Sequence, residues 1–284
     1  MSPLITVAEL IALYPSGNLV LVDANGGKDA KTNYMARHLD HALFVDVNTQ
    51  LADIKPDVSQ GGRHPLPTPE QFSSVLSSLG ISTQSHVIVY DDLQGSNAAA
   101  RLWWMLKAIG HDTVQVLDGG FQEAVRLGFP VHSGAEQPIP AQHYAAKKWN
   151  LPLADMHVVE RVSQDKAYRV IDVRSQERYD GLTEPIDLIA GHIPGAINVP
   201  FTSNLDNKGL FLSAAELKKQ YEKILGEVRA ENIIVHCGSG VTACHTLLAM
   251  AYAGLEIPRL YVGSWSEWSR CDKPMVTKEA GSVK

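Results

Sequence analysis

Short runs of β-branched and other apolar residues alternate along this chain with longer segments in which apolar residues recur at helical spacing. The short runs lie near Val20, Ile88, Val116, Ile171, Ile234 and Tyr261. This alternation is typical of a parallel sheet with helices on both faces, so we predict an α/β fold. In open sheets of this kind, ligands bind at the carboxyl ends of the strands.

Polar residues mark several expected helix ends. Thr6 with Glu9 and Ser213 with Glu216 fit the capping box, and Thr68 precedes a proline at the first helical position. Three glycines follow apolar-periodic segments and are expected just beyond helix C-termini: Gly80, Gly110 and Gly254.

The pattern also repeats once. Residues 36–47 (ARHLDHALFVDV) resemble residues 190–201 (AGHIPGAINVPF), and residues 87–92 (VIVYDD) resemble residues 233–238 (IIVHCG). A repeat this long indicates duplicated domains, since solenoid units run about 20 to 50 residues. We predict domains at 1–132 and 153–284, joined by a linker at 133–152 that is rich in proline, glycine, serine and alanine.

Composition narrows the class of protein. The 284 residues carry a formal net charge of −6, with 45% hydrophobic and 20% charged residues, which is typical of a soluble globular protein. No block of lysine or arginine exceeds a pair, so a nucleic-acid partner is not expected. No apolar run approaches the length of a membrane span, and the N-terminus lacks a signal-peptide pattern. The cytoplasm is therefore the expected compartment.

The chain has three cysteines, Cys237, Cys244 and Cys271, without CxxC spacing. This pattern fits a reducing compartment and argues against a disulfide framework and a structural zinc site built on cysteine. No metal or organic cofactor is indicated. We expect Cys244 and Cys271 to be ordinary structural residues.

Cys237 has a different setting, in the stretch HCGSGVTA from His236 to Ala243. It ends an apolar strand and precedes a helical segment, where main-chain N–H groups and the helix dipole favour a thiolate. A cysteine phosphatase would need an arginine at the position of Ala243. The segment also fits a GxGxxA dinucleotide fingerprint, but the next strand ends at Val262 without an acidic residue for the ribose.

This loop resembles the active-site loop of the rhodanese-like sulfurtransferases, and its CGSGVT form is similar to the 3-mercaptopyruvate branch. Further motifs of the second half carry the same resemblance: GHIPGAINVP (191–200), RYDG (178–181), EP (184–185) and GSWSEW (263–268). In the first half, YDD (90–92), AARLWWMLKAIGH (99–111) and LDGGF (117–121) look like the family's inactive partner domain. The resemblance implies two tandem rhodanese-like domains, each a parallel β-sheet with helices on both faces.

The first half has Asp91 at the position that matches Cys237. Aspartate cannot carry a persulfide, so we expect this domain to be non-catalytic and to form one wall of an inter-domain cleft. Asp91 and Asp92 are expected to be solvated turn residues. Trp103 and Trp104 are expected to pack into the core or the domain interface.

The resemblance assigns roles around Cys237. The persulfide would be stabilised by the loop residues Gly238, Ser239, Gly240, Val241 and Thr242, and Ser239 would form a proton relay with His64. The acidic residue that completes the relay in some members is Asn48 here, with Asp46 nearby in sequence.

Three arginines are candidates for binding substrate. Arg174 and Arg178 follow the strand that ends at Asp172, and arginine can bind a carboxylate through two hydrogen bonds. Arg63 is a third candidate. The arginine that usually follows the EP pair in the mercaptopyruvate branch is Ile186 here, which leaves the donor preference open. We expect structural roles for Asp172 and for the histidine of the GHIPGA motif, His192.

The predicted function is transfer of sulfur from 3-mercaptopyruvate to a thiol, cyanide or a thioredoxin-like protein through a persulfide on Cys237, with release of pyruvate. Two alternatives remain open. The same cysteine could use thiosulfate as donor, or the chain could be a non-enzymatic rhodanese-like sulfur carrier or binding module.

Overall fold

The computed structural model describes residues 1–14, 17–138 and 143–278, and it divides the chain into two compact units. The first unit contains Met1–Asp53, Leu66–Leu151 and Asp206–Phe211, and the second contains Ile54–Pro65, Pro152–Leu205 and Leu212–Lys284. The short segment Ile54–Pro65 thus comes from the first half of the sequence but belongs to the second unit.

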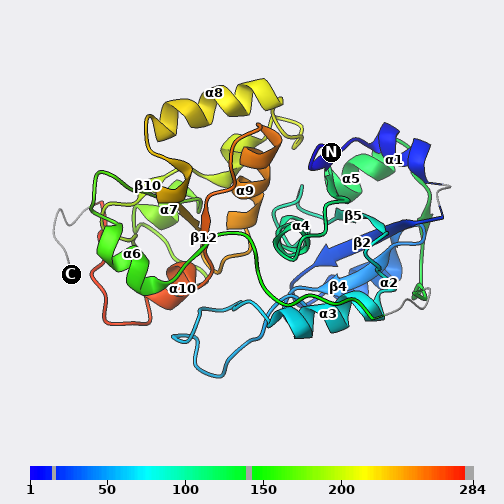
Figure 1. The fold of residues 1–284 in the computed structure, drawn as a ribbon, viewed down its shortest axis with the longest axis horizontal. Coiled ribbons are helices and arrows are strands. Elements are labelled where there is room, and N and C mark those ends of the chain that lie inside the picture. Colours follow the sequence, from blue (N-terminus) through cyan, green and yellow to red (C-terminus); the bar gives the residue numbers. More distant parts are fainter. Residues whose placement is uncertain (15–16, 139–142, 279–284) are drawn as a thin grey trace. The chain divides into compact units, whose positions relative to one another are not determined.

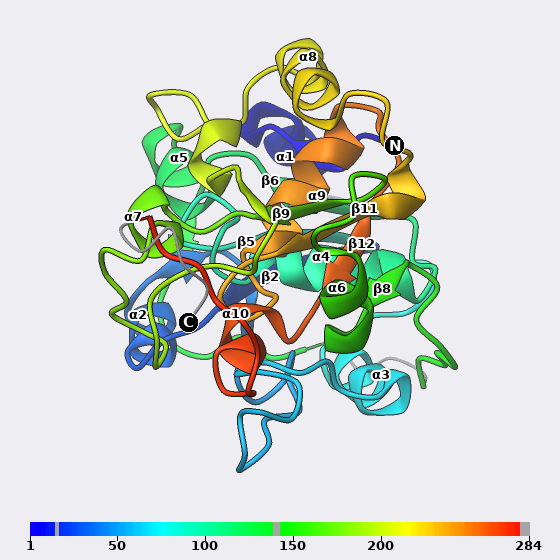
Figure 2. The ribbon, with the colours of Figure 1, turned by 90° about the vertical axis from the view of Figure 1, so that its left-hand side faces the viewer.

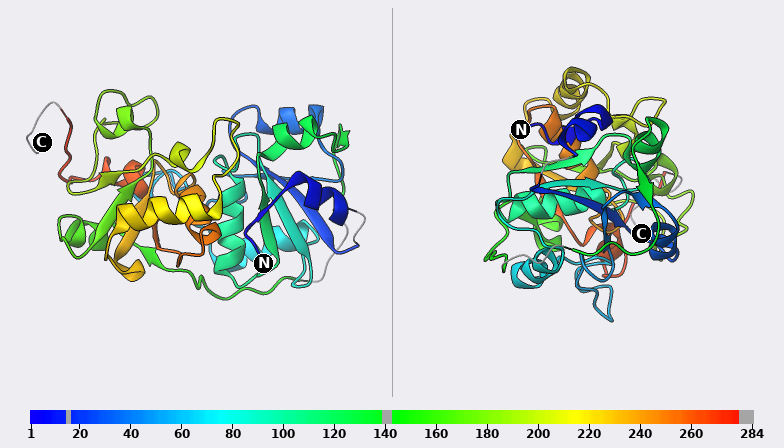
Figure 3. Two further views of the ribbon diagram at one scale, coloured as in Figure 1. Left: turned by 90° about the horizontal axis from the view of Figure 1, so that it is seen from above. Right: turned by 90° about the vertical axis from the view of Figure 1, so that its right-hand side faces the viewer.

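The first unit is built on a parallel sheet. Its strand order is β1 (Leu4–Ile5), β6 (Val114–Leu117), β5 (His86–Tyr90), β2 (Leu19–Asn25) and β4 (Leu43–Asp46). The strands predicted near Val20, Ile88 and Val116 are confirmed. They fan out with the twist usual for such sheets (Figure 3).

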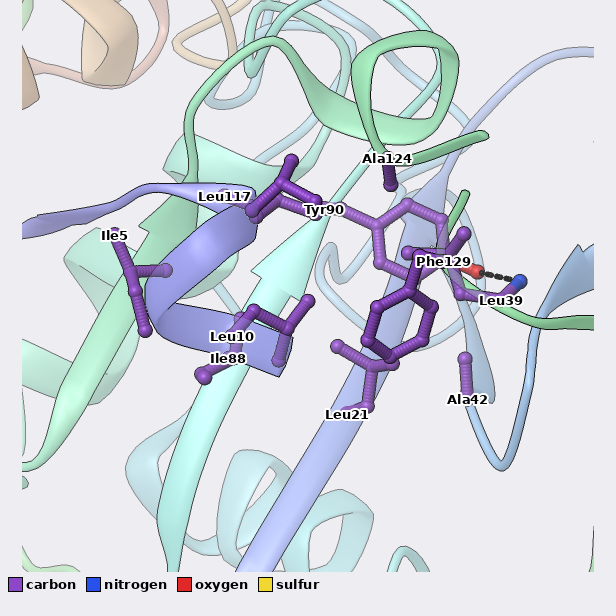
Figure 4. Packing of buried hydrophobic residues seen from close by; sticks show 11 residues of the cluster. Ile5, Leu10, Leu21, Leu39, Ala42, Ile88, Tyr90, Leu117, Ala124 and Phe129 are labelled. Carbon is purple, nitrogen blue, oxygen red and sulfur yellow. Dashed lines mark hydrogen bonds between the residues drawn. The ribbon is translucent and has the colours of Figure 1, made fainter. Parts of the chain in front are cut away.

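Helices lie on both sides of this sheet. Helices α1 (Val7–Leu13) and α5 (Gly120–Arg126) lie on one side, and α3 (Pro69–Ser78) lies on the other (Figure 1). Figure 4 shows the core on the first side, where Leu10 and Ala124 pack with Leu21, Ile88 and Tyr90. The Tyr90 hydroxyl accepts a hydrogen bond of 3.0 Å from the Leu39 N–H, so this large ring is buried with its polar atom paired.

The remaining elements of the first unit flank the sheet. Helix α4 (Ala99–Ala108) packs on β2, β5 and β6, and α2 (Ala30–Ala36) contacts β4. Trp103 and Trp104 of α4 are buried, as predicted for residues that pack into the core or the domain interface. Two further strands, β3 (His38–Leu39) and β7 (Val131–His132), pair antiparallel.

The second unit repeats this architecture. Its parallel sheet has the order β10 (Ile197–Asn198), β9 (Arg169–Asp172), β11 (Ile233–His236), β12 (Arg259–Tyr261) and β8 (Leu153–Ala154). Helices α6 (Met156–Val162) and α10 (Ser264–Trp268) pack on the face that carries Ile234 and Tyr261 (Figure 2). Because side chains alternate along a strand, Val235 points to the opposite face, where α9 (Ala243–Tyr252) contacts β11 and α8 (Ala214–Leu225) covers α9. A short helix, α7 (Gln176–Tyr179), follows β9.

The predicted helix ends agree with the structure. Capping boxes are present at Thr6 and Ser213, and Thr68 forms a third one with Gln71 in front of a proline. The three glycines expected after helices all have positive φ angles, with 70° at Gly80, 88° at Gly110 and 75° at Gly254. Glycine adopts this conformation without steric cost.

The segment predicted as a linker has neither helix nor strand in its described residues, 133–138 and 143–152. Part of it packs closely on the first unit: the Trp149 ring lies 6.2 Å from the Trp104 ring, and the Asn150 N–H donates to the Ala108 carbonyl. The predicted domain limits stay a prediction. Among the described residues, no helix is long and apolar enough to cross a bilayer.

Candidate active site

The loop that carries Cys237 leaves β11 and enters α9, at the carboxyl edge of the second sheet. The start of α10 holds it in place. The Cys237 N–H donates to the Ser264 hydroxyl at 3.2 Å, and the carbonyl groups of Cys237 and Gly238 accept the N–H groups of Trp265 and Ser266. The GSWSEW motif therefore fixes the main chain on both sides of a cysteine that is only 3% exposed.

Gly240 gives this loop its tight path. Its φ is 74°, and a Cβ atom there would lie 2.5 Å from the Val262 carbonyl oxygen. A larger residue would thus meet both backbone strain and a steric clash with main-chain atoms.

Several main-chain N–H groups of the loop are free to bind an anion. Within the described residues, the N–H groups of Gly238, Ser239 and Val241 donate to no acceptor, although these residues are buried. A buried, unpaired N–H is costly in a protein. Successive N–H groups next to a helix N-terminus form a concave anion site, and this is the arrangement expected around the sulfur of Cys237.

His64 lies next to the loop. Its Nδ1 is 2.8 Å from the Ser239 hydroxyl oxygen, so the two residues predicted as a relay are in hydrogen-bond contact. The segment that carries His64 is anchored to the second unit, since the Gly61 N–H donates to Glu267 and the Arg63 N–H donates to Ser266. Asp46 instead accepts the N–H groups of Asn48 and Thr49 in the first unit, and a third relay member stays a prediction.

Two guanidinium groups lie against the loop. A Cβ on Gly238 would be 3.0 Å from Arg63 Nη2 and 3.5 Å from Arg178 Nη2. Both arginines pair with the buried Asp187, through Arg63 Nε at 3.1 Å and Arg178 Nη2 at 3.2 Å. Within the described residues, the Nη1 group of each has no acceptor, so each keeps donors for a bound anion.

Arg174 has a different environment. Its side chain is 1% exposed and donates to Asp172, to Glu184 and to the Gly191 carbonyl. Burial favours a raised pKa for Asp172, but the charges of Arg174 and His236 and the hydrogen bonds from Arg174 together hold that pKa below its usual value. Burial also favours a raised pKa for Glu184, but the hydrogen bonds and charge of Arg178, together with the N–H groups of Ile186 and Asp187, lower that pKa. Arg174 is thus committed to a buried ion-pair network.

Sequence reasoning missed two charged residues here, Asp187 and Arg270. Arg270 donates to Asp187 at 3.0 Å, so one carboxylate holds three guanidinium groups. Neither position stands out in the sequence, because their role depends on contacts between distant segments. His192, expected to be structural, lies with its Nδ1 2.8 Å from the Tyr179 carbonyl.

The corresponding loop of the first unit corrects one expectation. Asp91 is not a solvated turn residue; it is fully buried, and its carboxylate accepts the N–H groups of Leu93, Gly95, Asn97, Ala98 and Ala99. A carboxylate at this position can accept hydrogen bonds from the N–H groups of its own loop, and this explains why Asp91 is buried. Asp92 is half-buried.

The other two cysteines lie outside the turn between β11 and α9. Cys244 is buried in α9, with its Sγ 3.5 Å from the Gly240 carbonyl. Cys271 is half-buried, and burial raises the pKa of its thiol. Among the described residues, side chains close enough together to hold a metal ion occur only in the first unit.

Comparison with known proteins gives the family. The model described as "Rhodanese-like domain" matches residues 6–126 and 156–271. A probable 3-mercaptopyruvate sulfurtransferase of Pseudomonas aeruginosa is 35% identical over 271 residues, which cover 93% of this chain and 94% of the relative. A thiosulfate sulfurtransferase of Rattus norvegicus is 37% identical over 254 residues, which cover 88% and 83%.

A solved structure agrees with these relatives. The 3-mercaptopyruvate sulfurtransferase from Leishmania major matches with a TM-score of 0.82 and 30% identity, covering 94% of this chain and 74% of that one. The predicted fold of two tandem rhodanese-like domains and the predicted class of enzyme are thereby confirmed. The chain belongs to the rhodanese-like sulfurtransferases and carries the family's domain twice.

Proposed function

We propose that this sulfurtransferase takes sulfur from 3-mercaptopyruvate, holds it as a persulfide on Cys237 and releases pyruvate. The observation that carries this proposal is the contact between His64 and Ser239 beside the Cys237 loop, at 2.8 Å. A donor whose leaving group must gain a proton needs such a pair of proton-transferring groups. Relatives named 3-mercaptopyruvate sulfurtransferase support the same choice.

The substrate carboxylate is proposed to bind Arg63 and Arg178. Both guanidinium groups lie against Gly238, next to the reacting cysteine, and each has an Nη1 group without an acceptor in the described part of the chain. Arginine suits this task because its planar donors match a carboxylate. Arg174, predicted from sequence as a further ligand, is proposed instead to hold Asp172 and Glu184, since its own donors are already used.

In the first step, the Cys237 thiolate attacks the sulfur of the donor. A sulfur–sulfur bond forms, the carbon–sulfur bond breaks, and its electron pair leaves as the enolate of pyruvate. The donor's thiol proton passes to that carbon through Ser239 and His64, so the products are pyruvate and a negatively charged persulfide. The N–H groups of Gly238, Ser239 and Val241 stabilise this charge, with Gly240 and Thr242 completing the loop.

In the second step, an acceptor attacks the outer sulfur and regenerates the Cys237 thiolate. Cyanide would leave as thiocyanate, and a small thiol or a thioredoxin-like protein would leave as a persulfide. Because the two half-reactions share one covalent intermediate, we expect ping-pong kinetics. The cytoplasm is the proposed compartment, because three cysteines without CxxC spacing fit a reducing environment.

Thiosulfate is the second candidate donor, because relatives at similar identity are named thiosulfate sulfurtransferases. Its leaving group is sulfite, which, unlike the enolate of pyruvate, does not have to gain a proton. The two guanidinium groups at Gly238 would suit this dianion as well.

Donor kinetics and mass spectrometry test the proposal. We expect a higher kcat/KM with 3-mercaptopyruvate than with thiosulfate, and a mass gain of one sulfur on Cys237 that cyanide removes. Cys237→Ser should lose both, whereas Cys244→Ser, a change at a neighbouring buried thiol, should retain them. A clear preference for thiosulfate would contradict the proposed donor, and transfer by the Cys237→Ser variant would contradict the mechanism.

A further inference from the structure

We propose a metal site in the first unit, formed by His38, His132 and Glu136, that binds Zn²⁺ or a similar divalent transition-metal ion. The site lies where β3 and β7 pair, since His38 is opposite His132 in this two-stranded ladder. Glu136 follows β7 by four residues. The site is independent of the sulfur-transfer reaction.

His38 supplies the main argument. Its side chain is 0% exposed, and its Nδ1 lies 2.7 Å from the Tyr34 carbonyl oxygen. A carbonyl only accepts, so Nδ1 carries the proton, and in the neutral ring the lone pair is on Nε2. This buried Nε2 has no hydrogen-bond partner among the described residues. Histidine ligands of metals have this arrangement, with one nitrogen on the ion and the other donating to a carbonyl or carboxylate.

The other two side chains face the same point. His38 Nε2 is 3.6 Å from Glu136 Oε1, which is beyond hydrogen-bond distance, and His132 Nδ1 is 2.8 Å from that oxygen. All three potential ligand atoms lie within 4.8 Å of one another. Tetrahedral zinc with bonds of 2.0–2.1 Å separates its ligand atoms by about 3.4 Å. Small movements would therefore bring the three ligand atoms to the separation that zinc requires. The His132 side chain, which is 57% exposed, has room to move.

The surroundings fix the ligands in place. The Tyr34 ring stacks on His38 with 4.1 Å between ring centroids, and the Tyr34 hydroxyl accepts the Glu136 N–H. His41 Nδ1 lies 3.8 Å from Glu136 Oε2, so a further imidazole is near. Glu136 and His41 also line a cavity of about 780 Å³, through which an ion can reach the carboxylate.

The donor set selects the class of ion. Two imidazole nitrogens and one carboxylate oxygen suit Zn²⁺, Co²⁺, Ni²⁺ or Cu²⁺, whereas Ca²⁺ and Mg²⁺ prefer oxygen ligands alone. Three protein ligands leave a fourth position for water. Sequence spacing gave no sign of this site because His38 is separated from His132 by most of the first half of the chain.

Metal binding to the full-length protein tests the proposal. The metal-free chain in the Cys237→Ser background, which removes the reactive thiolate as a ligand, would be titrated with Co²⁺ and then with Zn²⁺ in competition. We expect one ion per chain, a visible Co²⁺ spectrum without a thiolate charge-transfer band, and a higher melting temperature with Zn²⁺. His132→Ala and Glu136→Gln should each weaken binding at least about tenfold and abolish the thermal shift.

His157→Ala is the matched control, because it removes an exposed histidine of the second unit. It should bind as tightly as its parent. Equal binding by His132→Ala, Glu136→Gln and His157→Ala would overturn the proposal. So would the absence of metal binding in the parent.

Discussion

Two arginines that are only four residues apart differ in how far their side chains are buried. Arg174 is enclosed and donates to Asp172 and Glu184, whereas Arg178 is 15% exposed and reaches Gly238 with a free Nη1 group among the described residues. Both follow the same strand, so sequence alone gave them similar roles. A side chain whose donors are already used cannot gain a strong contact with substrate, and one with a free donor can.

Removing the Arg178 guanidinium should therefore weaken substrate binding. A hydrogen bond to a charged group contributes about 1.5–3 kcal/mol, so we expect Arg178→Ala to lower kcat/KM for 3-mercaptopyruvate by about 10- to 100-fold. Steady-state kinetics measure this loss. Arg161→Ala, which removes an exposed arginine of the same unit, is the control and should leave kcat/KM unchanged. Equal kcat/KM values for the two variants would argue against a carboxylate contact.

Asp23 of β2 is a buried acid whose titration affects stability. Burial raises its pKa to about 7, although the hydrogen bond from Asn25 opposes this change. The folded state then binds a proton that the unfolded state has released, so stability falls between about pH 4 and pH 7, by up to about 4 kcal/mol. Asp23→Asn should remove this decline and unfold at higher urea concentration than the parent at pH 8. Parallel stability profiles from pH 5 to pH 8 would show that Asp23 is not the responsible group.

At the scale of elements, the tight loop between β11 and α9 depends on Gly240. Gly240 and Gly254 have nearly the same φ, 74° and 75°, but only Gly240 has main-chain atoms where a Cβ would lie. Gly254→Ala should thus lower the free energy of unfolding only by the backbone strain, about 1–2 kcal/mol. Gly240→Ala should lower the free energy of unfolding in urea by more than Gly254→Ala does. It should also prevent the mass gain of one sulfur on Cys237 that mass spectrometry detects. Normal loading of the Gly240→Ala variant would mean that the loop tolerates a different path.

The elements show which features the sequence could predict. Strands such as β5 and β11 follow from local apolar runs, and the helix starts at Thr6, Thr68 and Ser213 follow from local capping. These features depend on neighbours in sequence. The very short strands, among them β3 and β7, were not predicted because two residues give no periodicity and their pairing joins distant segments.

At the scale of the whole molecule, the two rhodanese-like domains have matching loops that differ in the side chain they carry. In the first, the Asp91 carboxylate satisfies five main-chain N–H groups, and in the second, Cys237 leaves N–H groups unpaired within the described residues. Cys237 could be predicted from its loop because the signal is local. Asp187 could not, since its three arginine partners come from three separate segments.

The proposed relay of Ser239 and His64 also joins distant parts of the chain, because His64 comes from the segment Ile54–Pro65, which belongs to the second unit. If Ser239 and His64 move one proton together, then either Ser239→Ala or His64→Ala should slow turnover of 3-mercaptopyruvate by about 100-fold or more, and the double variant should lose little beyond that. Thiosulfate is the control donor, since sulfite leaves without a proton on carbon, so the same variants should keep most of their rate with it. Steady-state rates with both donors measure the difference. Additive losses, or equal losses with the two donors, would mean that the two residues only position the loop.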